Sequence, residues 1–399
     1  MIKKIINKTI TDIKGVYATG IHCVLKFKKK DLAFIYVPEA AASAGVFTRN
    51  KFCASCVTFT KKVLKKNVLK AVIMNSGNAN AGTGELGTKN TKHMAKITAD
   101  MLGINASEVG VASTGIIGKQ LPMDVLEAGI KKVLANPYVV DGSAAAEAIL
   151  TTDTCLKQAF FETKIDGKRV VVAGISKGSG MLAPNMATTL TYLVTNANLE
   201  QKFLQAALAD AINDTYNMTS VDTDTSTNDM ALLISTKEDG VVIKTNKDKD
   251  VFLALLTEAC TDLCKMITTD GEGATKLIEV NVVGAANGTD ARKIAMNVVD
   301  SPLVKTAIHG EDPNWGRVIA AAGKSPEVKL NPDKFDLYFG DVQILAKGMP
   351  VAYDDFALKE QLKNNKVFIT LELNLGSATA KAWGCDLTKG YIDINTKYN

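Results

Sequence analysis

The chain has 399 residues, of which 46% are hydrophobic and 22% charged, a balance typical of a globular protein that argues against disorder. The net charge of +5 is mild, and the lysine runs at 28–30, 61–62 and 65–66 carry no interleaved aromatic residues. These runs therefore favour solvated surfaces, and we expect no nucleic-acid partner.

The sequence also bears on location. It contains no run of about 18 apolar residues, so no membrane span is expected. Residues 1–8 lack the apolar run and small-residue cleavage site of a signal peptide. The seven cysteines are an odd number spread along the chain, which fits a reducing compartment better than a disulfide framework. We therefore expect a cytoplasmic protein without a membrane partner.

Two cysteine pairs allow a metal-binding interpretation. Cys53 with Cys56 and Cys260 with Cys264 have spacings that could supply four thiolates to zinc. However, Cys260 and Cys264 fall on the apolar stripe of a predicted helix, where cysteine behaves as a small hydrophobic residue. Structural burial is the favoured interpretation, and no metal is expected.

Apolar residues at helical spacing and short β-branched runs predict mixed secondary structure. In chain order, the expected elements are a strand at 71–74, a helix at 121–135, strands at 170–175 and 189–195, a helix at 199–215 capped by Asn198, strands at 230–235 and 240–243, a helix at 250–268, and strands at 278–283 and 367–373. The irregular order predicts an α+β architecture rather than a doubly wound parallel sheet. Turn-rich residues at 284–290 indicate a domain boundary near residue 280.

Residues 174–190 concentrate the features of a reactive segment. A predicted strand enters a loop with two closely spaced glycines, and a new strand is predicted to begin at Thr188. The Thr188 hydroxyl can attack the carbonyl of Ala187, giving an ester that water opens to leave a free amino group on Thr188. An α-amine has a pKa of about 7.7–8.0, so it can accept the proton of its own hydroxyl near neutral pH.

Residue chemistry alone leaves other interpretations open. A threonine that merely starts a strand is ordinary, because β-branched residues belong there, and this interpretation is the favoured one on these grounds. The glycine-rich loop completes no phosphate-binding pattern and precedes a strand, which argues against nucleotide binding. The three histidines lie in no serine-elbow motif, so nothing indicates a Ser-His-Asp hydrolase.

The same segment resembles the processing motif of the ornithine acetyltransferase family, whose bifunctional members are also N-acetylglutamate synthases of arginine biosynthesis. The resemblance rests on KGSGM at 177–181 and PNMAT at 184–188, and it covers essentially the whole chain. Further motifs match in the same order: GVFT at 45–48, NSGNANA at 75–81, STGIIG at 113–118, TTDT at 151–154, DTSTND at 224–229, GEGATK at 271–276, SPLVKTA at 301–307, DPNWGR at 312–317 and WGCDLT at 383–388.

The resemblance implies a layered α/β/β/α fold of the N-terminal-nucleophile type found in the aminopeptidase and ornithine acetyltransferase group. Residues 1–280 would form the catalytic core, and residues 281–399 a smaller α+β domain whose tail returns to the active site. Self-cleavage between Ala187 and Thr188 would give an α chain of residues 1–187 and a β chain of residues 188–399. Two copies of each would form an α2β2 heterotetramer.

The resemblance also implies roles for particular residues. Thr188 would be the nucleophile, and Thr114 with Gly115 would form the oxyanion hole, for which a hydroxyl and a backbone N–H are suitable donors. Lysine suits a substrate carboxylate and glutamate suits a cationic substrate end. The substrate-contacting positions of the family match Thr151, Lys177, Thr188, Glu272 and Asn395.

The implied reaction is a ping-pong transfer of acetyl from N-acetyl-L-ornithine to L-glutamate through acetyl-Thr188, with no cofactor. The resemblance leaves open whether acetyl-CoA serves as a second acetyl donor, which would make the enzyme bifunctional. One alternative is an autoprocessing N-terminal-threonine aminopeptidase or amidase. Another is a non-catalytic protein that binds a metal or a partner through its cysteine pairs.

The sequence departs from the family pattern at Thr223, where the family has glycine. If the backbone at this position needs a positive φ, threonine strains it. The flanking Asp222 and Asp224 have no role that the sequence supports, and a structural one is as plausible as a functional one.

Overall fold

The computed structural model describes residues 1–183, 189–237 and 239–397 of the chain. The chain divides into two compact units. The first comprises residues 1–178, 184–217 and 225–263, and the second comprises residues 179–183, 218–224 and 264–399. Each unit has a hydrophobic core of its own.

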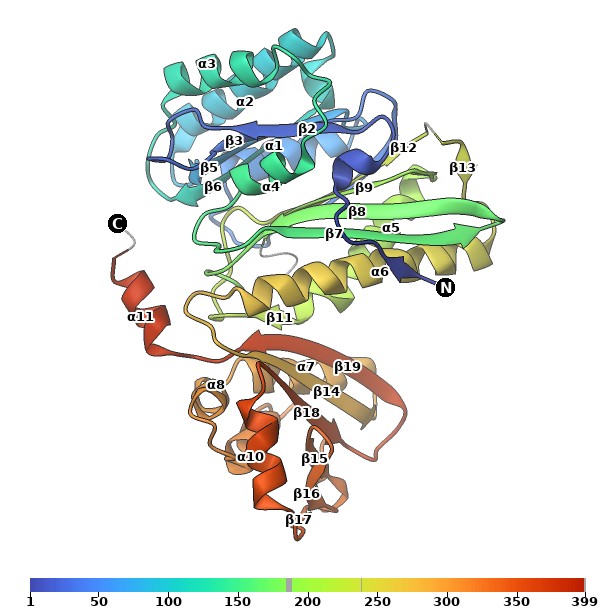
Figure 1. Ribbon diagram of the computed structural model, residues 1–399, viewed down its shortest axis with the longest axis vertical. Helices are drawn as coiled ribbons and strands as arrows, with labels where there is room; N and C mark the ends of the chain where they lie inside the picture. Colours follow the sequence, from blue (N-terminus) through green and yellow to red (C-terminus); the bar gives the residue numbers. More distant parts are fainter. Residues whose placement is uncertain (184–188, 238, 398–399) are drawn as a thin grey trace. The chain divides into compact units, whose positions relative to one another are not determined.

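The first unit contains a four-stranded sheet with the order β2-β3-β5-β6. Its strands are β2 (Tyr17–Ile21), β3 (Leu32–Tyr36), β5 (Ala71–Asn78) and β6 (Val109–Ile116), and its helices are α1 (Ser55–Leu64), α2 (Gly84–Leu102), α3 (Met123–Val133) and α4 (Gly142–Ala148). In Figure 1, α2 and α3 cover the outer side of this sheet. All five residues of β3 are buried, so this strand is covered on both faces.

The second sheet of this unit has six strands in the order β1-β7-β8-β9-β12-β4. These are β1 (Lys3–Lys4), β7 (Lys157–Ile165), β8 (Lys168–Lys177), β9 (Leu190–Thr195), β12 (Met230–Thr236) and β4 (Ala40–Phe47); a small pair, β10 (Ala197–Asn198) with β13 (Val241–Val242), lies apart. Helices α5 (Gln201–Asp214) and α6 (Asn246–Thr269) run along its outer side (Figure 1).

The inner faces of the two sheets share one core. Phe34 of β3 and Tyr192 of β9 belong to the same cluster of buried side chains. Helix α4 packs against β2 and β3 and also contacts β7 and β8. With helices outside both sheets, the layers follow the order α/β/β/α, which confirms the fold class predicted from the sequence.

The edge of the six-stranded sheet is closed by two glutamine side chains. Gln201 accepts from the backbone N–H of Ser43 at 3.1 Å and donates to its carbonyl at 2.6 Å. Gln205, one helical turn further along α5, makes the same pair of bonds with Gly45. These amides occupy backbone groups that an unpaired edge strand would offer to another chain, so β4 is protected from further pairing.

The second unit is built on a seven-stranded mixed sheet with the order β11-β19-β14-β18-β15-β16-β17. The strands are β11 (Thr219–Ser220), β14 (Leu277–Ala285), β15 (Asp336–Phe339), β16 (Val342–Ala346), β17 (Met349–Pro350), β18 (Lys366–Glu372) and β19 (Ala378–Cys385). The helices are α7 (Gly288–Val299), α8 (Pro302–His309), α9 (Trp315–Ala322), α10 (Asp355–Lys363) and α11 (Lys389–Asn395).

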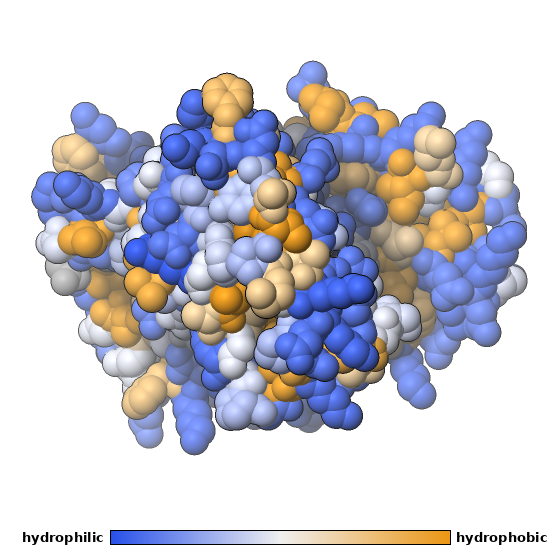
Figure 2. All heavy atoms as spheres, turned by 90° about the horizontal axis from the view of Figure 1, so that it is seen from below, coloured by the Kyte–Doolittle hydropathy of each residue, from blue (hydrophilic) through white to orange (hydrophobic). Residues whose placement is uncertain are grey.

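On the face shown in Figure 2, hydrophobic residues occur in small groups among hydrophilic ones.

The predicted elements all occur, with shifted ends. The helix expected at 121–135 is α3, the one at 199–215 is α5 and the one at 250–268 is α6, which starts at Asn246. The predicted Asn198 cap is wrong: Asn198 belongs to β10, where it pairs with Val242, and Glu200 precedes α5 without a side-chain cap bond. The boundary predicted near residue 280 lies within β14, and the division into domains stays a prediction.

Candidate functional site

Ala187 and Thr188, the predicted cleavage site, lie outside the described residues. The chain is described again from Thr189, whose carbonyl accepts from the N–H of Met230 at 2.8 Å. The strand predicted to begin at Thr188 is β9, which the structure begins at Leu190. The residue after the predicted nucleophile is therefore hydrogen-bonded to the first residue of β12, within the six-stranded sheet.

Thr114 and Gly115 lie near the end of β6, and Thr114 is buried. Gly115 has a φ of +128°, and a Cβ there would come within 2.4 Å of the carbonyl carbon of Gly77, its register partner on β5. Any other residue would clash with backbone rather than with a flexible side chain. The predicted oxyanion-hole glycine is thus required by the local geometry.

Lys177, at the end of β8, reaches the predicted oxyanion hole. Its Nζ donates to Oγ1 of Thr114 at 3.3 Å. In the sheet, Lys177 is the register partner of Leu190, the first residue of β9. Two residues of the predicted site therefore contact each other beside the strand that follows the cleavage point.

Thr151 is positioned by Asp153, which belongs to the matched motif at 151–154 but to which the sequence assigned no role. The buried Asp153 carboxylate accepts from the N–H of Thr151 at 3.0 Å, from the N–H of Gly178 at 2.8 Å and from Nζ of Lys157 at 2.6 Å. Burial alone would raise the pKa of Asp153, but the charges of Lys177 and Lys157 outweigh it and lower this pKa to about 2. Asp153 thus fixes the backbone at Thr151 and at Gly178, the residue after Lys177, and so positions two of the predicted substrate contacts.

Asn228 is a second residue whose role the sequence did not show. Its amide nitrogen donates to the carbonyl of Ala79 at 2.6 Å and to that of Ser113 at 2.8 Å. Ser113 in turn donates its hydroxyl to Asn75 at 2.7 Å. The matched motifs at 75–81, 113–118 and 224–229 are therefore one polar network that holds the end of β6.

Lys26 brings another cation to this region. Its Nζ donates to the carbonyl of Leu150 at 3.0 Å, next to Thr151. A Cβ on Gly77 would lie 3.0 Å from Cγ of Lys26, so the lysine stem covers the strand that faces Gly115. Burial lowers the pKa of Lys26 to about 8, partly offset by the charge of Asp31. No motif in the sequence indicated this residue.

In the second unit, the structure brings Glu272 and Asn395 together. Nδ2 of Asn395 donates to Oε2 of Glu272 at 2.8 Å, and the N–H of Glu272 donates to the carbonyl of Ser179 at 3.1 Å. Glu272 is mostly buried, and a Cβ on Gly180 would lie 2.3 Å from its carboxyl group. Both predicted substrate contacts of this unit thus contact each other, and a side chain at position 180 would displace the Glu272 carboxyl group from this position.

Asp222 contacts the segment that leads to the cleavage site. Its carboxylate accepts from the N–H of Met181 at 2.6 Å and from that of Leu182 at 2.7 Å. Burial and the nearby charge of Asp224 raise the pKa of Asp222, against the backbone hydrogen bonds, which lower it. This acidic residue, to which the sequence assigned no role, holds backbone close to the predicted cleavage point.

The backbone at Thr223, where the family pattern has glycine, has a positive φ. Its φ is 67°, in the left-handed region, which costs a non-glycine residue roughly 1–2 kcal/mol and suits a β-branched residue least. Thr223 is exposed, so its side chain has little packing to lose.

We therefore expect T223G to raise the free energy of unfolding by about 1 kcal/mol, after the entropy cost of glycine is subtracted. Urea denaturation measures this change. The same substitution at Thr88 inside α2, where the backbone is helical, should instead lower stability by about the same amount. A T223G protein that is less stable than the parent protein would contradict the conclusion that the backbone at Thr223 is strained.

The cysteine pairs show no metal geometry in the part of the chain described. Cys56, Cys260 and Cys264 are fully buried, as predicted for the last two, whereas Cys53 is exposed. Within residues 1–183, 189–237 and 239–397, no three His, Cys, Asp or Glu side chains are grouped to hold a metal ion. Among the same residues, no helix has the length and apolar character needed to cross a membrane.

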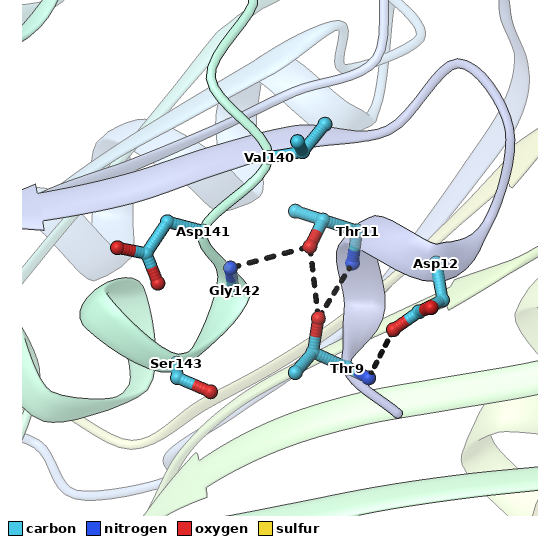
Figure 3. A pocket seen from close by; sticks show the side chains of 7 residues that line it. All are labelled: Thr9, Thr11, Asp12, Val140, Asp141, Gly142 and Ser143. Carbon is cyan, nitrogen blue, oxygen red and sulfur yellow. Dashed lines mark hydrogen bonds between the residues drawn. The ribbon is translucent and has the colours of Figure 1, made fainter. Parts of the chain in front are cut away.

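A pocket of about 290 Å³ lies elsewhere in the first unit, and Figure 3 shows its lining. Thr9 and Thr11 share a hydrogen bond of 2.8 Å, and Thr11 accepts from the N–H of Gly142 at 3.3 Å. These polar groups already satisfy one another, and none of the predicted site residues lines the pocket. The pocket lies between residues 9–12 and the start of α4, and it is not the candidate site.

Comparisons with known proteins agree along the whole chain. Residues 17–399 match the ArgJ family. The arginine biosynthesis bifunctional protein ArgJ of Bacillus cereus is 43% identical over 400 residues, which cover 100% of this chain and 98% of that protein. The protein of the same name from Lactococcus lactis is 45% identical over 399 residues, covering 99% of each chain.

Two solved structures are similar over part of the chain. The ArgJ protein of Bacillus halodurans has 42% identity and a TM-score of 0.45, with 47% of this chain and 98% of that chain covered. The ornithine acetyltransferase of Mycobacterium tuberculosis, solved with ornithine, has 38% identity and a TM-score of 0.43, with 47% of this chain and 100% of that chain covered. The family match and the full-length relatives show that this chain belongs to the ArgJ family.

Proposed function

We propose that this protein is an acetyltransferase of arginine biosynthesis that moves an acetyl group from N-acetyl-L-ornithine to L-glutamate. Relatives named bifunctional ArgJ match it over essentially their whole length, and the neighbour from Mycobacterium tuberculosis was solved with ornithine. The observation that carries the chemistry is the contact of Lys177 with Thr114, next to the strand that begins two residues after Thr188.

Self-cleavage prepares the nucleophile. Oγ of Thr188 attacks the carbonyl carbon of Ala187, the C–N bond breaks, and the hydroxyl proton ends on the departing nitrogen. Water then adds to the resulting ester, and the C–O bond breaks. Ala187 keeps the new carboxylate, Thr188 regains its hydroxyl, and the freed α-amine can serve that hydroxyl as a base.

Acetyl transfer follows in two steps. Thr188 attacks the acetyl carbonyl of N-acetylornithine, and ornithine leaves with the proton on its amine. The amine of glutamate then attacks the acetyl ester, giving N-acetylglutamate and free Thr188. Because two acyl transfers share one covalent intermediate, the reaction needs an oxyanion site that works in both directions.

The geometry of Thr114 suits that oxyanion site. Lys177 donates to its oxygen, so the hydroxyl proton of Thr114 is free to point at a developing oxyanion. A hydroxyl that accepts from an ammonium group is polarised and becomes a better donor. Gly115, the next residue, lets the backbone approach the reacting oxygen at the same point.

Glu272 and Asn395 suit the side-chain ammonium group of ornithine. The Glu272 carboxylate accepts one hydrogen bond from Asn395 and retains further acceptor positions for a cation. The same proposal includes acetyl-CoA as a second acetyl donor, an α2β2 assembly of the cleaved chains, and action in the cytoplasm without any cofactor.

The acetyl-enzyme is the direct test. Purified protein mixed with N-acetylornithine should gain one acetyl group on the fragment that begins with Thr188, and glutamate should remove it as N-acetylglutamate. Release of free acetate without glutamate would instead support the amidase alternative. Replacing N-acetylornithine by acetyl-CoA in the same assay tests the second donor, and sedimentation of the cleaved protein tests the assembly.

T114V should lower kcat/KM by about 10²–10³-fold, because it removes one oxyanion donor worth about 2.7–4 kcal/mol while keeping the side-chain shape. Steady-state transfer from N-acetylornithine to glutamate measures this loss. T114S retains the hydroxyl and should keep most of the activity. If T114V transfers acetyl groups as well as T114S does, Thr114 is not an oxyanion donor.

A further inference from the structure

Residues 179–183, here called the upstream segment, pack within the second unit although the strand before them belongs to the first. Ser179 donates its hydroxyl to the carbonyl of Asp270 at 2.7 Å, and its own carbonyl accepts from the N–H of Glu272. Leu182 is fully buried. The upstream segment is therefore fixed to the second unit at both ends, by the hydrogen bonds of Ser179 and by the burial of Leu182.

The contacts of the upstream segment centre on residues 221–224. The carbonyl of Leu182 accepts from the N–H of Val221 at 2.7 Å, and the N–H of Ala183 donates to the carbonyl of Asp224 at 3.0 Å. Between these two backbone bonds, the Asp222 carboxylate takes one N–H on each oxygen, from Met181 and from Leu182. All four consecutive bonds fix the backbone up to Ala183.

The backbone of the upstream segment has a conformation at Met181 that is unfavourable in an unconstrained chain. Met181 has a φ of 49°, in the left-handed region that non-glycine residues avoid. Two charge-assisted hydrogen bonds to adjacent N–H groups compensate for such a conformation, because a carboxylate can accept both at once. Without the carboxylate, the turn at Met181 would relax toward negative φ and carry Ala183 with it.

We propose that Asp222 is a positioning residue for self-cleavage, fixing Ala183 so that only residues 184–187 separate a held backbone from the attacking threonine. This inference rests on the proposed function. An intramolecular attack is fast only when few conformations compete with the reactive one, and holding the backbone up to Ala183 reduces the number of conformations open to the residues that follow.

The contact has a second consequence after cleavage. The upstream segment stays on the α chain, whereas Asp222 becomes part of the β chain. The same bonds then hold the new carboxyl-terminal tail of the α chain against residues 221–224. One carboxylate therefore directs the cleavage and afterwards retains its product.

D222N tests the proposal, because the carboxamide keeps one acceptor oxygen but presents an N–H₂ group where the second backbone N–H points. The rate at which the intact chain disappears after expression, followed by intact-mass spectrometry, should fall by about 10- to 100-fold. D224N is the matched control. In the described residues Asp224 contributes its backbone carbonyl and N–H to these contacts, so its side-chain substitution should leave the rate near that of the parent chain.

Folding is checked in a T188A background, where no chain can cleave. There, D222N should keep the thermal midpoint within a few degrees of T188A alone while the amides of Met181 and Leu182 lose protection from hydrogen exchange. Parent-like cleavage by D222N, equal slowing by D224N, or loss of the folded state in D222N would each overturn the proposal. Failure of the parent chain to cleave would instead reject the proposed function.

Discussion

T188A is expected to remain an uncut chain of 399 residues with no measurable acetyl transfer. The substitution removes the hydroxyl that both cleaves the backbone and carries the acetyl group. Loss of a nucleophile of this kind lowers kcat by at least about 10⁴-fold, because binding and oxyanion stabilisation alone recover little of the rate. Electrophoresis of the purified variant and an assay of N-acetylglutamate formation measure the two losses.

The neighbouring threonine supplies the control for T188A. Thr189 is buried, and its hydroxyl bonds that of Thr191 at 2.8 Å within the sheet. T189A removes this internal bond but not the predicted nucleophile, so the variant should still be cut and active. An active T188A protein, or an uncut T189A protein of normal stability, would assign the nucleophile to another residue.

D153N is expected to have the largest effect on stability, lowering the free energy of unfolding by about 3–5 kcal/mol. The side chains of Asp153 and Lys157 are both 0% exposed, and their charged atoms are 2.6 Å apart. Removing the Asp153 charge leaves the buried Lys157 ammonium group without its carboxylate, which costs far more than the pair contributes. Denaturation by urea, with CD as the signal, measures the loss.

A surface pair of the same geometry provides the control for D153N. Lys96 and Asp100 have the same i,i+4 spacing and the same 2.6 Å separation, but their side chains are 66% and 62% exposed. D100N should therefore change stability by no more than about 0.5 kcal/mol. Equal effects of the two substitutions would show that burial is not what makes Asp153 important.

The same pair predicts how stability depends on pH. The pKa of Asp153 is lowered to about 2 from its ordinary value of 3.8, so this carboxylate binds a proton less well in the folded protein than in the unfolded chain. The resulting stabilisation is present above about pH 4 and is lost as the pH falls toward 2. D153N should lack this part of the acid sensitivity between pH 4 and pH 2.

The sequence predicted the long, strongly patterned elements and missed the weak ones. Helices α3, α5 and α6 and strands such as β12 carry clear apolar patterns, and each appears close to its predicted range. Strand β4 is mostly alanine, serine and glycine, and α2 has few large apolar residues, so neither shows a usable period. Their structure depends on partners far away in the chain.

The candidate site shows the same division. The structure shows that Lys177 contacts Thr114 and that Glu272 contacts Asn395, all four being residues that the matched motifs pointed to, and their catalytic roles stay predictions. Asp153, Asn228 and Lys26 could not be assigned from sequence, because their contacts join segments that are distant in the chain. The possible backbone strain at Thr223 could be predicted from the sequence alone, because it depends only on the residue type and the local φ.

Mass spectrometry of the intact purified protein, combined with sequencing from each new amino terminus, tests the central claim most directly. A chain of 42.6 kDa that cleaves itself should yield two fragments, the second beginning Thr188-Thr189-Leu190. Fully active protein that still consists of one uncut chain would contradict the account.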